Sequence, residues 1–234
     1  MLDILRTLTL GATAGTLFAA LLISLPIRQG SRLTLAAGIG AWIALVVSLA
    51  GSGVVAGSPL VLPILFVLPL VAAGLAATSA LVRAAMMAIP APLIITLNAM
   101  RVLGVFMLIA AVAGRMSGPF PYFAGIGDVI TALFALPVAR LAARDPRDVR
   151  VLEWNIFGAL DLIVAVSLGT MSASGSPLQI IHAGVGSAAM TTLPWALIPL
   201  VLVPTYLIGH ALVFAHARAA APAGAVSQAR FAEA

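Results

Sequence analysis

The chain has 234 residues, of which 62% are hydrophobic and 8% are charged, and its mean hydropathy is +1.18. Soluble domains carry roughly 25% charged residues, so this composition excludes an ordinary soluble domain and predicts a polytopic membrane protein. The chain has no cysteine, which excludes disulfides and thiolate metal sites. All 12 basic residues are arginines, and the net charge of +5 comes from short loops, so we expect no nucleic acid partner.

Seven apolar stretches each approach the roughly 20 residues that a helix needs to cross a bilayer. The first is too long for a cleaved signal peptide and lacks a clear cleavage site. We predict an all-α fold: one bundle of seven transmembrane helices over residues 1–218, followed by a disordered cytoplasmic tail over 219–234. The predicted spans are Leu8–Ile27, Leu33–Val55, Leu60–Leu81, Leu93–Gly114, Tyr122–Ala139, Leu152–Met171 and Leu193–Ala215.

The arginines between these stretches predict the orientation. Loops on one side carry only Arg6 and Arg115, whereas nine arginines lie on the other side or in the tail. Because cytoplasmic loops are enriched in positive charge, the N-terminus should be outside and the C-terminus cytoplasmic. We expect an integral protein of the bacterial inner (plasma) membrane. The nine are Arg28, Arg32, Arg83, Arg140, Arg144, Arg147, Arg150, Arg218 and Arg230.

Arg101 lies in the middle of the fourth stretch. Its guanidinium stays charged, and at bilayer depth it needs a carboxylate, a carbonyl or water as partner. Counting along the helices places Arg101 and Asp161 about 12–14 Å from the cytoplasmic side, and His210 in the same third of the membrane. Arg101, Asp161 and His210 should therefore lie in one polar layer. Asn98 lies one helical turn from Arg101, and Tyr206 lies one turn from His210. The polar layer is interpreted either as a structural lock between helices or as a path for protons, ions or a solute.

Asp128 should lie in the outer half of the membrane, with no arginine at matching depth. We therefore expect its carboxyl to be neutral, hydrated or bound to something, as in proton-coupled devices. The string Gly125-Ile126-Gly127-Asp128 resembles the Gly-x-Gly-Asp signature of intramembrane aspartyl proteases. Those enzymes pair this aspartate with a second one on the preceding helix, where this chain has Asn98 and Arg101 instead. The other candidate, Asp161, follows on the next helix and by its estimated depth should lie well below Asp128.

Interior prolines predict kinks in two spans, because each proline removes a helical hydrogen bond and clashes with the preceding turn. The outer link before the last span contains Pro177–Met190, which we expect to lie along the membrane surface. The prolines are Pro59, Pro63 and Pro69 in or beside the third stretch, and Pro194, Pro199 and Pro204 in the seventh.

The leading hypothesis is a transporter or channel for a small solute or ion, proton-coupled through the buried Asp, Arg and His residues. The alternatives are an accessory or assembly subunit of a larger membrane complex, and an intramembrane enzyme using the Gly-x-Gly-Asp carboxylate. Seven helices with an outside N-terminus also resemble rhodopsins, but a chain without lysine cannot form their retinal Schiff base. We expect no catalytic residue, cofactor or metal. The expected partners are the lipid bilayer, the solute or ion, and further copies or other membrane subunits.

Overall fold

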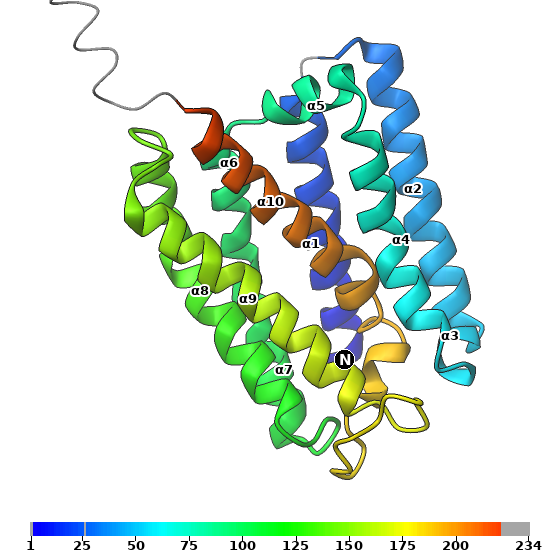
Figure 1. Ribbon diagram of the computed structural model, residues 1–234. Helices are drawn as coiled ribbons and strands as arrows, with labels where there is room; N and C mark the ends of the chain where they lie inside the picture. The colour runs from blue at the N-terminus through cyan, green and yellow to red at the C-terminus, as the bar shows by residue number, and fades with distance from the viewer. Residues whose placement is uncertain (1, 26, 221–234) are drawn as a thin grey trace, which may run out of the picture.

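The computed structural model describes residues 2–25 and 27–220, and every regular element in this part of the chain is a helix (Figure 1). This confirms the all-α prediction. The predicted tail lies mostly outside the described residues. The elements are α1 (Leu2–Ser24), α2 (Gln29–Gly51), α3 (Val54–Gly57), α4 (Val61–Ala76), α5 (Ala80–Met87), α6 (Ala91–Leu97), η1 (Asn98–Gly104), α7 (Val105–Val112), α8 (Phe120–Ala142), α9 (Val149–Met171), η2 (Ala188–Thr191), η3 (Ile198–Leu202) and α10 (Val203–Ala219).

Five helical stretches in the described chain are long and apolar enough to cross a membrane. The pair α4 and α5 would make a sixth, but the two helices are bent by 107° where they meet. In α1 only the stretch Ala12–Ser24, where the side chains are described without a gap, was compared with a membrane span, and this apolar stretch is shorter than a full span. The described residues thus contain five to six candidate membrane-spanning helices, and the predicted count of seven is not confirmed. The five stretches are Gln29–Gly51, Ala91–Val112, Phe120–Ala142, Val149–Met171 and Ile198–Ala219.

The long helices run up and down between two ends of the bundle (Figure 1). At the N-terminal end, α1 begins, and the links α2–α4, α7–α8 and α9–η3 lie together. At the C-terminal end, α10 finishes, α5 lies across the bundle, and the links α1–α2 and α8–α9 turn. The C-terminal end therefore gathers the segments that carry most of the arginines.

The fourth predicted span changes helix type where it meets α8. Between α6 and α7, the η1 segment is a 3₁₀ helix whose buried residues are Asn98, Arg101 and Gly104. With about three residues per turn, a 3₁₀ helix aligns positions i and i+3, so these three residues form one line along the helix. A Cβ atom at Gly104 would lie 2.5 Å from Cβ of Asp128, so only glycine allows this close approach of η1 and α8.

Helix α9 begins with Asp148 as its N-cap, whose side chain accepts a hydrogen bond from the Arg150 backbone N–H. Asp145 accepts a bond from the Arg147 N–H and forms a local turn. Hydrogen bonds from Arg150 lower the pKa of the exposed Asp148 carboxyl to about 2.

The prolines act differently in the two spans. Helix α4 continues through Pro69, and the sharp bend of this span follows Ala76, where α4 ends. In the last span, Ile198–Leu202 is a π-helical segment. Pro204 lacks the N–H that would bond the Leu200 carbonyl in an α-helix, and the Trp42 indole N–H donates to that carbonyl at 3.1 Å.

The link between α9 and η2 was expected to lie along the membrane surface, and it forms a series of turns. Ser117, in the α7–α8 link, fastens it by donating to the Ala183 carbonyl and accepting from the Gly186 N–H at 2.8 Å. The backbone N–H groups of Ile180 and Ile181 both bond the carbonyl of Met171 at 2.9 Å. The link therefore closes back on the end of α9.

Candidate functional site: a buried arginine between two aspartates

The centre of the bundle is organised by Arg101, whose side chain is 1% exposed. Its Nε donates to Asp128 Oδ1 of α8 at 2.6 Å, and its Nη2 donates to Asp161 Oδ2 of α9. Its Nη1 donates to the Gly158 carbonyl at 3.2 Å and lies 3.3 Å from His210 Nε2 of α10. One guanidinium therefore joins four helical segments, since its planar fork holds several acceptors in fixed directions.

The hydrogen bonds around His210 define its tautomer. Asn155 donates through Nδ2 to the backbone carbonyl of His210 at 3.1 Å, so its Oδ1 is the atom that faces His210 Nδ1 at 2.7 Å. An amide oxygen only accepts, and Nδ1 must therefore carry the proton. The opposite nitrogen, Nε2, is then free to accept from Arg101. His210 is a neutral imidazole in this arrangement.

Three glycines create the space for this cluster. A Cβ atom at Gly127 would overlap the Asp161 carboxylate, and one at Gly158 would lie 2.6 Å from Cε1 of His210. At Gly125 a Cβ would lie 2.9 Å from the Gly104 carbonyl oxygen. The Gly-x-Gly-Asp string is thus explained by packing: its first glycine admits η1, and its second admits the Asp161 side chain.

The structure brings together the four ionisable residues predicted from the sequence. The expectation that Asp128 lacks an arginine at matching depth was wrong, because Asp128 bonds Arg101 directly. The depth estimate assumed an α-helical rise of about 1.5 Å per residue, whereas the 3₁₀ segment rises about 2.0 Å per residue. The long arginine side chain covers the remaining distance.

Asn98 and Tyr206 also border the cluster. The Arg101 guanidinium carbon lies 5.7 Å from the centre of the Tyr206 ring, within the range of a cation–π contact. Asn98 donates through Nδ2 to the Ile94 carbonyl at 3.0 Å. Two of their buried atoms, Asn98 Oδ1 and the Tyr206 hydroxyl, have no hydrogen-bond partner among the described residues.

Two cavities approach the cluster from different sides. The Asp128 cavity, of about 300 Å³, extends from the loops at the N-terminal end to Asp128. The Tyr206 cavity, of about 260 Å³, lies between α1, α2, α6 and α10 and reaches Asn98 and Tyr206. Between them, a void of about 30 Å³ is bordered by Arg101, Asp128 and Tyr206 and is closed on one side by Thr13 of α1. This central void has room for a water-sized species.

Sequence reasoning missed three residues that complete the site: Trp154, Asn155 and Gly158. The Trp154 indole donates to the Thr131 carbonyl at 3.0 Å, and its ring lies 5.5 Å from the His210 ring. The signal was present in the sequence. Positions 154 and 158 precede Asp161 by seven and three residues, the spacing of a single helix face, and position 155 lies one turn before position 158.

The arrangement does not suit aspartyl protease chemistry. In that mechanism two carboxyl groups share a proton and activate a water molecule. Here the Asp128 and Asp161 carboxylates both accept hydrogen bonds from the Arg101 guanidinium. The guanidinium therefore takes the place of the proton that the two carboxyl groups would share. In the described part of the chain, no group of three or more His, Asp or Glu side chains could hold a metal ion.

Comparison with known families adds a relationship but no activity. The chain matches the model of a family described as "Domain of unknown function (DUF8737)" over residues 59–218. The chain belongs to this family. The matched region includes α4 to α9 and nearly all of α10, so every residue of the charged cluster lies inside the family region. No curated protein and no solved structure matches the chain.

Proposed function

We propose that the protein is a membrane transporter for a small solute, with its path through the Arg101 cluster. The observation that carries this proposal is the row of cavities around the cluster. Asp128 borders both the Asp128 cavity and the central void, and Tyr206 borders both the central void and the Tyr206 cavity. A purely structural ion pair has no need of cavities on two sides, whereas a transport site must be reached from both.

The orientation and the count of spans belong to the same proposal. The arginine-rich C-terminal end of the bundle faces the cytoplasm, in agreement with the positive-inside rule. Helices α1 and α4 cross the membrane with the five longer stretches, which gives seven spans with the N-terminus outside. The membrane is the bacterial inner membrane.

The helix types around Arg101 suggest how access could alternate. The cluster joins a 3₁₀ segment, η1, and α10, which directly follows the π-helical segment η3. Interruptions of this kind often mark hinges, because the backbone can change its hydrogen-bond pattern at small cost. Movement of η1 and α10 against α8 and α9 would open one cavity while closing the other. The unbonded Asn98 and Tyr206 atoms would then meet water or solute.

The test is two-sided accessibility, for which the chain is well suited because it has no cysteine. Thr170 lines the Asp128 cavity and Thr205 lines the Tyr206 cavity, so Thr170→Cys and Thr205→Cys each place one thiol in one cavity. In oriented vesicles, we expect a membrane-impermeant thiol reagent to modify the first from the outside and the second from the cytoplasmic side.

Ser167→Cys is the matched control, since Ser167 lies on the exposed face of α9, one turn before Thr170, and should meet lipid. We expect no modification there. If either cavity cysteine is as inert as the control, the site is not reached from both sides and the transport proposal is wrong.

A further inference from the structure

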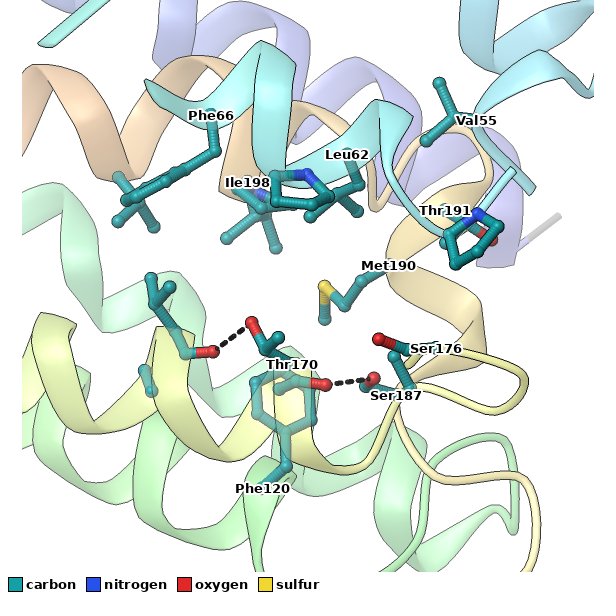
Figure 2. Close-up of a pocket in the computed structure, with 18 of the residues that line it drawn as sticks. Val55, Leu62, Phe66, Phe120, Thr170, Ser176, Ser187, Met190, Thr191 and Ile198 are labelled. Carbon is teal, nitrogen blue, oxygen red and sulfur yellow. Dashed lines mark hydrogen bonds between the residues drawn. The ribbon is translucent and has the colours of Figure 1, made fainter. Parts of the chain in front are cut away.

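The lining of the Asp128 cavity identifies the chemistry of a ligand. Its volume of about 300 Å³ is at the lower end of the range for small-molecule sites. Figure 2 shows Phe66 and Phe120 entering from opposite walls, with Met190 between them. Most other lining residues are Leu, Val, Ile, Ala or Pro. Such a cavity favours an apolar, preferably aromatic, body, and the flexible methionine can adapt to its shape.

Two hydroxyl groups in the lining of this cavity, those of Thr170 and Ser187, are arranged to accept hydrogen bonds. The Thr170 hydroxyl donates to the Val166 carbonyl at 2.8 Å, and the Ser187 hydroxyl donates to the Gly169 carbonyl at 2.6 Å (Figure 2). Because the Thr170 and Ser187 protons are already used, these two oxygens offer mainly lone pairs to a ligand. A ligand that donates hydrogen bonds or carries positive charge is therefore favoured.

The charge of the Arg101 cluster also favours a positively charged ligand. Among the described residues that line this cavity, Asp128 is the one charged side chain. The cluster contains two carboxylates and one guanidinium, while His210 is neutral by its hydrogen bonds. One negative charge is therefore uncompensated in a region of low dielectric constant, where charge is costly unless it is paired. One added positive charge beside Asp128 would balance it.

We propose that the Asp128 cavity binds a small organic monocation, such as an aromatic amine, with its cationic group beside Asp128 and its apolar body between Phe66 and Phe120. This assignment rests on the transport function proposed above and names its substrate class. The aromatic rings add stacking with the apolar body to the attraction between the Asp128 carboxylate and the cation. A proton and the organic cation are alternative ways to balance the same charge. Binding of one therefore releases the other, with Arg101, Asp161, His210 and Tyr206 facing the exchange site.

The first experiment measures binding to the purified full chain in detergent by isothermal titration calorimetry. The probe is benzyltrimethylammonium, and phenylacetate is the anionic comparison of similar size. We expect the cation to bind and the anion to bind at least tenfold more weakly. Equal affinity for the two probes, or no binding of the cation, overturns the proposal.

Variants locate the binding site. Asp128→Asn should weaken binding of the cation at least tenfold, while Asp148→Asn, the same change at an exposed site, should leave it unchanged. Asp128 is also a partner of Arg101, so a second variant leaves the cluster intact. Ala165→Leu fills the cavity and should abolish binding while the protein remains folded. Unchanged affinity in either Asp128→Asn or Ala165→Leu contradicts the proposed site.

The two proposals can fail separately. If the cation binds at Asp128 while Thr205→Cys is inert from the cytoplasmic side, the ligand class is correct and transport is wrong. If both cavity cysteines react but benzyltrimethylammonium does not bind, the path is correct and the substrate class is wrong.

Discussion

Helix α2 and the helices around the Arg101 cluster are all apolar enough to cross a membrane, but they differ in how far they are buried. In the most apolar windows of Ala91–Val112 and Phe120–Ala142, 44% of the residues are buried, in Ile198–Ala219 50% are buried, and in Val149–Met171 28% are buried. In α2 the corresponding share is 11%. Lipid is as apolar as leucine, so hydrophobicity does not draw membrane helices together. The difference lies in the polar cluster and in the glycines that surround it.

The region that matches the family model also separates the first helices from the helices that form the Arg101 cluster. The match begins at residue 59, after α1, α2 and α3, and includes the whole Arg101 cluster. Helix α1 nevertheless supplies Thr13 to the central void and Leu17 to the Tyr206 cavity. The first helices thus cover the side of the core that faces the Tyr206 cavity, while the charged contacts come from the second part of the chain.

Removing the central guanidinium should produce the largest difference between the two parts. Arg101→Gln leaves two buried carboxylates without their cation, and loss of one partner of a buried ion pair costs about 3–5 kcal/mol. The same substitution at the exposed Arg83 of α5 should change the free energy of unfolding by less than about 0.5 kcal/mol. Reversible denaturation in mixed detergent micelles measures both. Equal effects at the two positions would show that the cluster does not hold the bundle together.

Glycine substitutions test the packing around the cluster. Gly127→Ala places a methyl group on the Asp161 carboxylate, and overpacking of this kind costs about 1–3 kcal/mol. Gly38→Ala in α2 is the matched control, because a Cβ there would have no described heavy atom within 4 Å. Alanine is the better helix former, so Gly38→Ala should be neutral or stabilise by up to about 1 kcal/mol. The same denaturation measurement compares them, and a stabilised Gly127→Ala variant would contradict the observed packing.

The sequence was sufficient to predict the helical class, the membrane character and the polar residues. Arg101 and Asp161 could be paired because both are rare intramembrane charges whose depths follow from a uniform helical rise. The pairing of Asp128 could not be predicted in this way. It depends on the 3₁₀ geometry of η1 and on the contact between Gly104 and Asp128, which no periodicity reveals.

The irregular parts of the last span were harder to predict. Prolines indicate that a helix will be disturbed, but Pro69 and Pro204 have different outcomes. A proline leaves the carbonyl four residues earlier without its helical N–H partner. A distant side chain can bond that carbonyl instead, and which side chain does so depends on tertiary packing. Trp42 lies 158 positions from Leu200 in the sequence, so its role could be found only in the structure.

The smallest expected effect concerns the hydrogen bond from the Trp42 indole to the Leu200 carbonyl, which joins α2 to the core. Trp42→Phe removes the donor to the Leu200 carbonyl and should cost about 1 kcal/mol, the typical contribution of one hydrogen bond. Pro204→Ala restores the backbone N–H that would satisfy the same carbonyl within the helix. In the Pro204→Ala background, Trp42→Phe should therefore cost less. A double-mutant cycle of unfolding free energies measures this coupling. If Trp42→Phe costs the same in both backgrounds, the indole does not replace the missing helical bond, and α2 is held to the core by apolar contact alone.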